Sequence, residues 1–380
     1  MKILFVSMHA IHATRWIENL SDSGHELYWF DVMGNGTLDI DTAIVQFTNW
    51  KKRKLPLIKG EYFLRKKIPN LYQKIQPCLE VTANEVLKKI ILEIQPDLVH
   101  SFEMQSCSYP ILKTMQKYSN LKWLYSCWGS DLYKYKEIPF HLPKIKEILT
   151  RIDYLHTDCI RDYDLALQLG FKGKHTGIVP GGGGFKLDLF QSYFLPLEER
   201  KIILVKGYQH HVGRGLQIVK ALEQLPHLFK QYQIVVFGAH LEVQKYIDKK
   251  KLPFKYYDRH GLSHEEILRL MGSAVLYIGN STSDGMPNTL LEAIIMGAFP
   301  IQSNPGGVTA EIIQNMENGM LIENPESVEE IKEIVENITK NPQLIKKALS
   351  FNQQELKIQY EYTYIQQKII DLYFKIEKEL

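Results

Sequence analysis

This sequence of 380 residues has few cysteines, no low-complexity tract and no long hydrophobic run. No segment approaches the roughly 20 apolar residues needed to span a bilayer, and the start, MKILFVSMHA, is typical of a β-strand and not of a signal peptide. We therefore expect a cytoplasmic protein. The four cysteines are dispersed without a Cys-x-x-Cys pair, which argues against common zinc and redox motifs and favours free thiols: Cys78, Cys107, Cys127 and Cys159.

The chain also lacks a strong charge imbalance, with 46 Lys and Arg against 43 Asp and Glu. The clearest local excess is KKRKLPLIKGEYFLRKK, residues 51–67, with eight basic residues and one acid. Interleaved Leu, Ile, Tyr and Phe make this segment a candidate for peripheral contact with the inner face of the cell membrane. A solvated basic face on a helix–loop–helix is at least as good an interpretation. No recognised nucleic-acid-binding motif accompanies the segment, so we expect no nucleic-acid partner.

Short apolar runs alternate with amphipathic stretches along the whole chain. The runs predict two series of strands: KILFVS, ELYWFDV, DLVHS, LKWLYS, DYLHT and HTGIVP in the first half, and KIILVKG, QIVVFG, FKYY, AVLYIG, AFPIQS and GMLIE in the second. Strands that are apolar throughout and separated by helices indicate parallel sheets covered on both faces, and two such series predict two doubly wound α/β domains. The boundary between the two domains is predicted near PGGGGFKLD, residues 180–188, where four successive glycines give the backbone unusual conformational freedom. We predict an N-terminal domain at 1–185, a C-terminal domain at 186–360, and a terminal helix at 361–380 that packs back on the first domain.

The most informative stretch of the second half is SDGMPNTLLEA, residues 283–293. Pro287 suits a helix start and Gly297 suits its end, so Asp284 lies in the loop before this helix and Glu292 lies within it. Glu292 suits the vicinal hydroxyls of a ribose, and Asp284 faces whatever lies beyond the phosphates. The alternative interpretation of this sequence is a simple turn followed by a solvent-exposed acidic residue in the helix. The remaining predicted ligand contacts are Gly285 and Met286 in the loop and the amides of Asn288, Thr289 and Leu290, which suit phosphate oxygens.

Positive charge is predicted near this helix start. The strand KIILVKG ends in Lys206, and the following loop offers Arg214. Cations placed in such loops stabilise the negative charge that develops on a departing diphosphate. Gly238, at the end of the strand QIVVFG, would let a ligand approach the backbone.

These residues, with LSHEEILRLMGSA and ENGMLIE, resemble the donor-binding domain of retaining glycosyltransferases of family 4, which have the GT-B fold. The resemblance implies that Glu292 binds the ribose, Asp284 contacts the transferred sugar, and Lys206 and Arg214 hold the diphosphate. Two departures are visible. The first acid is usually glutamate, and the basic pair is usually Arg then Lys at closer spacing.

The resemblance extends to the first half with lower specificity. MHAIHATRW occupies the place of a glycine-rich loop near the acceptor, and SCWGSDLY has Trp128 where the family has histidine. Phe102 aligns with a histidine often found near the transferred sugar, so Glu103 is the nearest polar candidate for catalysis. The predicted acceptor-side residues are His9, His12, Arg15 and Asp131.

The sequence therefore predicts a metal-independent hexosyltransferase that moves a sugar from a UDP- or GDP-sugar to a glycan or lipid-linked acceptor, in bacterial surface polysaccharide or glycoconjugate synthesis. No cofactor is expected, since the acidic triplets DID at 39–41 and DYD at 162–164 are too short to indicate a metal site. The resemblance implies retention without an enzyme nucleophile. Two alternatives remain open: a nucleotide-sugar 2-epimerase of the same fold, and a non-catalytic nucleotide-sugar-binding protein.

Overall fold

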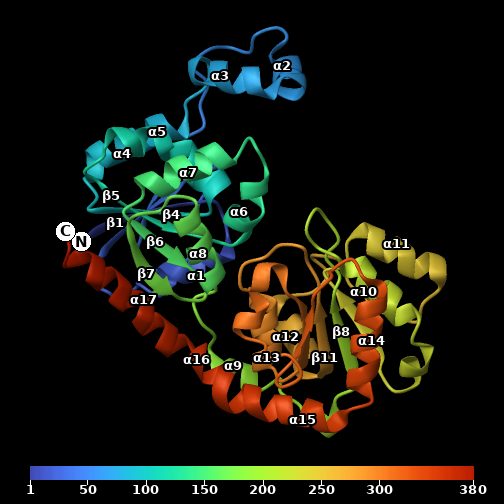
Figure 1. The fold of residues 1–380 in the computed structure, drawn as a ribbon. Coiled ribbons are helices and arrows are strands. Elements are labelled where there is room, and N and C mark those ends of the chain that lie inside the picture. Colours follow the sequence, from blue (N-terminus) through green and yellow to red (C-terminus); the bar gives the residue numbers. More distant parts are fainter. The chain divides into compact units, whose positions relative to one another are not determined.

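The computed structural model describes residues 1–380, apart from the side chains of Asn70 and Gln73. The chain forms two compact units (Figure 1). Unit 1 comprises Met1–Thr157, Asp162–Gly182 and Lys368–Leu380, and unit 2 comprises Asp158–Arg161 and Gly183–Gln367. Each unit holds one parallel sheet covered by helices, which confirms the predicted α/β class with two Rossmann-like domains.

The sheet of unit 1 has seven parallel strands in the order β3-β2-β1-β4-β5-β6-β7. Six of them coincide with predicted strands, and the edge strand β3 was missed. Its three residues, VQF, are too short and too exposed to give a hydrophobic pattern. The strands are β1 (Lys2–Ser7), β2 (Glu26–Asp31), β3 (Val45–Phe47), β4 (Leu98–Phe102), β5 (Lys122–Ser126), β6 (Tyr154–Thr157) and β7 (Lys174–Ile178).

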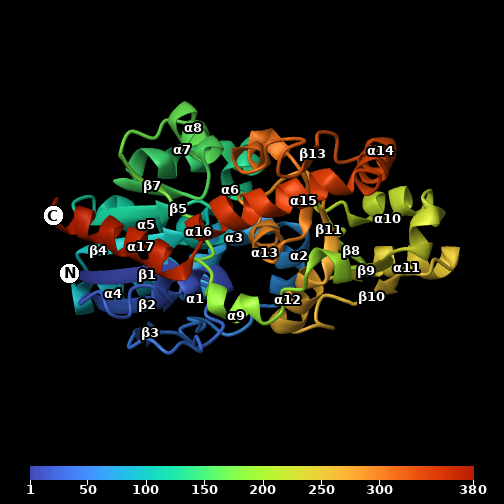
Figure 2. The same cartoon turned by 90° about the horizontal axis from the view of Figure 1, so that it is seen from below.

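Side chains of these strands alternate between two buried faces, as the period of a strand requires. Leu4 and Val6 of β1 belong to a core that includes helices α4, α5 and α7. Phe5 faces the opposite side, where its ring lies 6.2 Å from that of Tyr373 in α17. Seen from below, the C-terminal part of α17 crosses these strands (Figure 2). The main helices of unit 1 are α1 (Ile11–Glu18), α2 (Glu61–Lys67), α3 (Pro69–Leu79), α4 (Ala83–Ile94), α5 (Leu112–Lys117), α6 (Ser130–Tyr133) and α7 (Leu142–Arg151). Helices α8 (Ile160–Gln168) and α17 (Tyr362–Glu377) belong to unit 1 from Asp162 and from Lys368 onward.

Unit 2 contains a six-stranded parallel sheet in the order β10-β9-β8-β11-β12-β13. All six strands were predicted from the sequence. They are β8 (Ile202–Lys206), β9 (Gln233–Phe237), β10 (Lys255–Tyr256), β11 (Ala274–Gly279), β12 (Phe299–Ser303) and β13 (Met320–Ile322). The helices are α9 (Leu187–Gln191), α10 (Gly215–Glu223), α11 (Leu241–Lys250), α12 (His264–Gly272), α13 (Asn288–Ile295), α14 (Val328–Thr339), α15 (Pro342–Phe351) and α16 (Lys357–Gln359).

Helix α13 is the central element of unit 2, and six of its eight residues are buried. It packs with α12 on one face of the sheet, whereas α10, α11, α14 and α15 cover the other. The helix begins directly after Pro287 and is followed by Gly297, whose φ of +76° is left-handed. Both ends therefore lie where the sequence predicted them.

No helix among the described residues is long and apolar enough to cross a bilayer. The four cysteines are free, and three of them are buried: Cys107, Cys127 and Cys159.

Candidate active site

In unit 2, the buried hydroxyl of Tyr277, in strand β11, belongs to a hydrogen-bonded group with Thr289 and Lys206. This hydroxyl donates a hydrogen bond to Thr289 Oγ1, at 3.1 Å, in the first turn of α13. Lys206 Nζ, from the end of β8, donates to the same Thr289 oxygen at 3.1 Å. Burial raises the pKa of Tyr277, and the carboxylates of Asp284 and Glu292 raise it further. The structure therefore brings Lys206, Asp284 and Glu292 to one place, at the carboxyl edge of the sheet where ligands of such folds bind.

Glu292 is buried and only 4% exposed. Its Oε1 lies 2.7 Å from Nε2 of His264, the first residue of α12. This contact orients the acid from a second helix. Sequence reasoning missed His264, although it follows the Ser263 cap that a capping-box pattern marks.

The loop that carries Asp284 is held by a segment far away in the sequence, residues 158–161. Arg161 donates to the carbonyl oxygens of Asp284 and Pro305, both at 2.7 Å. The amide of Met286 donates to Asp158 Oδ2 at 3.1 Å. These contacts fix the backbone at the predicted sugar-contacting acid, and sequence reasoning gave neither Asp158 nor Arg161 a role at this site.

The start of α13 offers fewer open donors than the sequence suggested. The amide of Leu290 donates to the carbonyl of Pro287 at 2.9 Å. Pro287 itself occupies the N-cap position and makes no side-chain cap. The polar groups that suit an anion at this helix start therefore include the side chains of Lys206 and Thr289.

Arg214 is engaged in holding its own loop. Its Nε pairs with Glu326, and its Nη1 donates to the carbonyl oxygens of His210 and Gly213 at 3.0 and 2.9 Å. The guanidinium therefore has carboxylate and carbonyl partners in this structure. Its role as a diphosphate ligand stays a prediction.

Gly238 is in close contact with an aromatic ring. A Cβ at this position would lie 2.4 Å from Tyr208 Cε1, and the backbone φ is +59°. Tyr208 also lies beneath the Lys206 ammonium, 4.9 Å from its ring centre. The absence of a side chain at Gly238 thus admits the Tyr208 ring, which in turn contacts a predicted phosphate ligand.

A group of cations and histidines surrounds this ring. Burial, with a further contribution from nearby His211, His240, Lys206 and Arg259, lowers the pKa of His210 to about 4. The Arg259 guanidinium lies 6.0 Å from the Tyr208 ring centre. Lys206 and Arg259 thus place positive charge next to the Tyr208 ring, in the turn after β8, where it can attract an anionic ligand.

In unit 1, a partly buried acid, Glu103, and a buried acid, Asp131, lie beyond the carboxyl ends of β4 and β5. Glu103 accepts hydrogen bonds from the amides of Gln105 and Ser106, at 3.0 and 2.5 Å. Asp131 accepts from the Tyr125 hydroxyl and from the Trp128 amide. Burial and the charge of Asp131 raise the pKa of Glu103 to about 7, and burial also raises the pKa of Asp131. A carboxyl group with this pKa suits proton transfer near neutral pH.

The other predicted acceptor-side residues lie in or before α1. His9 Nε2 is 3.0 Å from the carbonyl of Gly36, and the His12 ring lies 5.6 Å from Trp128. Arg15 is in the last turn of α1. The structure thus places His12 beside the loop that carries Asp131.

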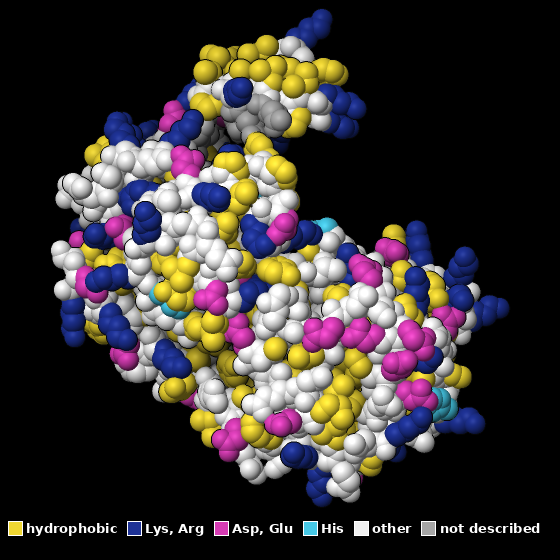
Figure 3. Space-filling model, viewed as in Figure 1, with side chains coloured by type: hydrophobic (Ala, Val, Ile, Leu, Met, Phe, Trp, Pro, Cys, Tyr) yellow, Lys and Arg dark blue, Asp and Glu magenta, His cyan; other side chains and the backbone are white. Residues whose placement is uncertain are grey.

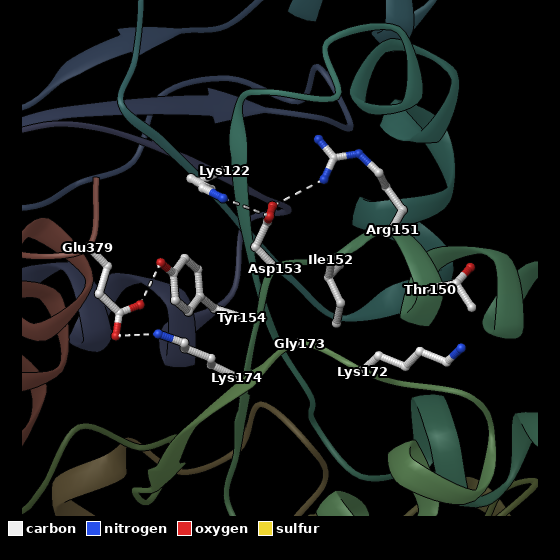
Figure 4. Close-up of a pocket in the computed structure, with 10 residues that line it drawn as sticks. All are labelled: Lys122, Thr150, Arg151, Ile152, Asp153, Tyr154, Lys172, Gly173, Lys174 and Glu379. Carbon is white, nitrogen blue, oxygen red and sulfur yellow. Dashed lines mark hydrogen bonds and ion pairs between the residues drawn. The ribbon is translucent and has the colours of Figure 1, made fainter.

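One pocket of unit 1 lies at the opposite, amino-terminal edge of the sheet and has a volume of about 420 Å³ (Figure 4). Its acids are already paired, since Asp153 contacts Lys122 and Arg151, and Glu379 contacts Lys174. Parallel α/β sheets bind ligands at the other edge. We therefore assign no site to this pocket.

Two family models together match most of the chain. Residues 186–356 match the glycosyl transferases group 1 model, and residues 2–159 match the glycosyl transferase 4-like model. Each half of the chain is thus similar to a glycosyltransferase domain, and the fold is that of the GT-B glycosyltransferases.

Solved structures agree with this fold over the whole chain. Sucrose-phosphate synthase from Thermosynechococcus elongatus is 15% identical with a TM-score of 0.72, and the match covers 100% of both chains. A glycosyltransferase from Rickettsia africae is 18% identical with a TM-score of 0.68, covering 100% of this chain and 99% of that one. Anabaena HepE in complex with UDP and glucose is 14% identical with a TM-score of 0.70, covering 99% and 100%. No curated protein matches the sequence.

Proposed function

We propose that this protein is a retaining, metal-independent hexosyltransferase. Its donor is a UDP- or GDP-sugar, bound by unit 2, and its acceptor is a glycan or a lipid-linked sugar in the synthesis of a surface polysaccharide or glycoconjugate. The observation that carries the proposal is the hydrogen-bonded group Lys206–Thr289–Tyr277 at the start of α13, with Asp284 and Glu292 near enough for their charges to raise the pKa of Tyr277. Support for the donor class comes from HepE, a protein of the same fold that has been crystallised with UDP and glucose.

Each group of this cluster has a proposed role. Glu292, oriented by His264, accepts hydrogen bonds from the two ribose hydroxyls. Lys206 and the start of α13 neutralise the diphosphate, so that charge developing on the leaving group is stabilised without a metal ion. Asp284 contacts the hydroxyls of the transferred sugar. The shorter side chain of aspartate, compared with glutamate, sets a different reach and hence a different sugar preference.

A panel of UDP- and GDP-sugars, assayed for released nucleotide with glycan and lipid-linked acceptors, tests this function. We expect one nucleotide sugar to be turned over, and Lys206→Ala and Glu292→Gln each to lower kcat/KM at least about a hundredfold, the usual scale for a lost electrostatic contact. Lys201→Ala is the matched control for Lys206, because Lys201 is exposed and directly precedes the same strand. Glu333→Gln, on the exposed face of α14, is the control for Glu292.

The products separate the proposal from its rivals. Donor epimerised in the absence of any acceptor would identify a 2-epimerase. Calorimetric binding without nucleotide release would identify a binding protein. An inverted anomeric centre in the product, detected by NMR, would contradict retention, and undiminished turnover by both site variants would contradict the site.

A further inference from the structure

Residues 51–80 of unit 1 form a hairpin-like excursion that carries α2 and α3. Its base is closed by backbone hydrogen bonds from Lys54 to Leu79, at 2.8 Å, and from Val81 to Lys52, at 2.9 Å. Beyond this base, α2 and α3 pack on each other (Figure 1). The excursion is therefore a defined element with its own closure.

Large apolar side chains of this excursion are exposed to solvent. Leu57 is 79% exposed, Tyr62 is 75% exposed and Phe63 is 59% exposed. Ile58, Ile68 and Leu71 are exposed as well. Figure 3 shows hydrophobic side chains gathered along α2 and α3, with Lys and Arg at the margins. A grouped apolar surface of this kind marks an interaction site.

The acids of the excursion are turned inward. Glu61 is buried, and Arg53 holds it with two hydrogen bonds of 2.7 and 2.8 Å. Arg53 lowers the pKa of Glu61 to about 2, so this acid stays ionised and paired. Arg53 also pairs with Glu80 at 3.3 Å. The acids thus neutralise the inner arginine and leave the outer surface without negative charge.

The outer cations have no such partners. Lys54 pairs with Glu85, but among the described residues no ion pair involves Lys51, Lys52, Lys59, Arg65, Lys66 or Lys67. Exposed lysines and arginines next to exposed Leu, Ile, Tyr and Phe match an anionic bilayer, whose headgroups attract the cations while its acyl boundary accepts the apolar groups. A nucleic acid would satisfy the cations only.

We propose that the excursion of residues 51–80 is a membrane-docking element that binds the surface of bilayers rich in anionic lipid. Leu57 and Phe63 enter the headgroup–acyl boundary, and Lys59, Lys66 and Lys67 contact lipid phosphates. This inference is independent of the donor and of the reaction. It concerns only where the protein resides.

Co-sedimentation of the full chain with lipid vesicles tests the proposal. We expect binding to phosphatidylcholine vesicles that contain phosphatidylglycerol, and little binding to pure phosphatidylcholine. High salt should weaken this binding because the cations are exposed. Lys59→Gln/Lys66→Gln/Lys67→Gln should weaken it by about tenfold or more, and Leu57→Ser/Phe63→Ser should also weaken it. The matched control is Lys230→Gln/Lys245→Gln/Lys249→Gln, which removes three exposed lysines of unit 2.

All substituted residues are exposed, so circular dichroism should show every variant folded. Equal binding to both lipid mixtures, absence of vesicle binding, or equal loss in the unit 2 control would each overturn the proposal. Self-association in sedimentation velocity that Leu57→Ser/Phe63→Ser abolishes, without vesicle binding by the wild type, would assign the surface to a second copy instead. Vesicle binding is measured without any donor, so a failure here and a failure of the proposed reaction are distinguishable.

Discussion

At the scale of single residues, Glu103 is the clearest departure from ordinary behaviour. Its backbone φ of +58° is uncommon for a residue with a side chain, and the amides of Gln105 and Ser106 bind its carboxylate. These hydrogen bonds lower its pKa, but burial and Asp131 outweigh them and raise it to about 7. The conformation thus keeps a titratable acid close to a second acid at the carboxyl edge of the sheet.

This pKa predicts a pH dependence of stability. Glu103 titrates near its ordinary 4.5 in the unfolded chain and near 7 in the fold. Between these values the folded protein holds a proton that the unfolded chain has released, so raising the pH through this window destabilises the fold. The free energy of unfolding of Glu103→Gln relative to wild type, measured with urea, should therefore increase from pH 5 to pH 8 by on the order of 2 kcal/mol.

The control is Glu93→Gln, an exposed acid of α4. Its stability relative to wild type should be the same at both pH values. If the free energy of unfolding of Glu103→Gln relative to wild type were also independent of pH, Glu103 would ionise normally in the fold.

At the scale of elements, the turn after β8 and the turn after β9 are packed against each other through Tyr208 and Gly238. The Tyr208 ring occupies the space of a Cβ at Gly238 and stacks on His240 at 5.5 Å. Because Lys206 lies over the same ring, the packing of this turn and the position of a predicted phosphate ligand are coupled.

Gly238→Ala should therefore destabilise unit 2 and weaken donor binding together. The added methyl clashes with Tyr208 and also imposes a left-handed conformation on alanine, so we expect a loss of about 2–4 kcal/mol. Gly24→Ala is the matched control, since Gly24 has φ +73° with nothing within 4 Å of its Cβ. It measures the conformational cost alone. Equal losses in urea unfolding of the two variants would contradict the clash with Tyr208.

At the scale of the whole molecule, each unit has its own buried core, and unit 1 also contains a chain of buried polar groups. Tyr373 of α17, His100, Ser126 and His156 are linked by successive hydrogen bonds of 2.6, 2.7 and 2.9 Å. Burial lowers the pKa of His156 to about 3 and lowers that of His100 well below its ordinary value. Both histidines are therefore neutral core residues that join α17 to the sheet.

Unit 1 should consequently lose stability in acid. Below the ordinary histidine pKa of 6.5 the unfolded chain binds protons that buried His100 and His156 cannot bind, so stability falls as the pH falls. The expected slope is about 1.4 kcal/mol per pH unit for each histidine below pH 6, added to the effects of the acids. Urea unfolding between pH 7 and pH 5, monitored by tryptophan fluorescence, measures it.

The exposed His227 of unit 2 provides the comparison. His227→Gln should leave the slope unchanged, whereas His156→Gln should reduce it. A pH slope that His156→Gln leaves unchanged would contradict the neutral state of the buried pair, because the opposing effect of Glu103 is present in both proteins.

Much of the fold follows from local sequence patterns. AVLYIG has no charged residue and KILFVS is apolar at its four central positions, because both faces of a parallel strand are buried, so their assignment needed no tertiary information. Pro287 and Gly297 marked the ends of α13 by their backbone preferences. The strand ends then gave Lys206 and Asp284, because all parallel strands present their carboxyl ends at one edge of the sheet. Their roles in binding stay predictions.

The sequence by itself thus determined every strand except β3, the limits of α13 and the charged groups at the strand ends, because these depend on neighbours within a few residues. Only the tertiary structure decided which partners those groups meet. Glu326 pairs with Arg214 across 112 residues, and Arg161 holds the Asp284 loop across 123. The elevated pKa of Glu103 likewise depends on burial and on an acid 28 residues away, Asp131 (131 minus 103). Burial and long-range pairing arise only when the chain is folded, so no local pattern carries them.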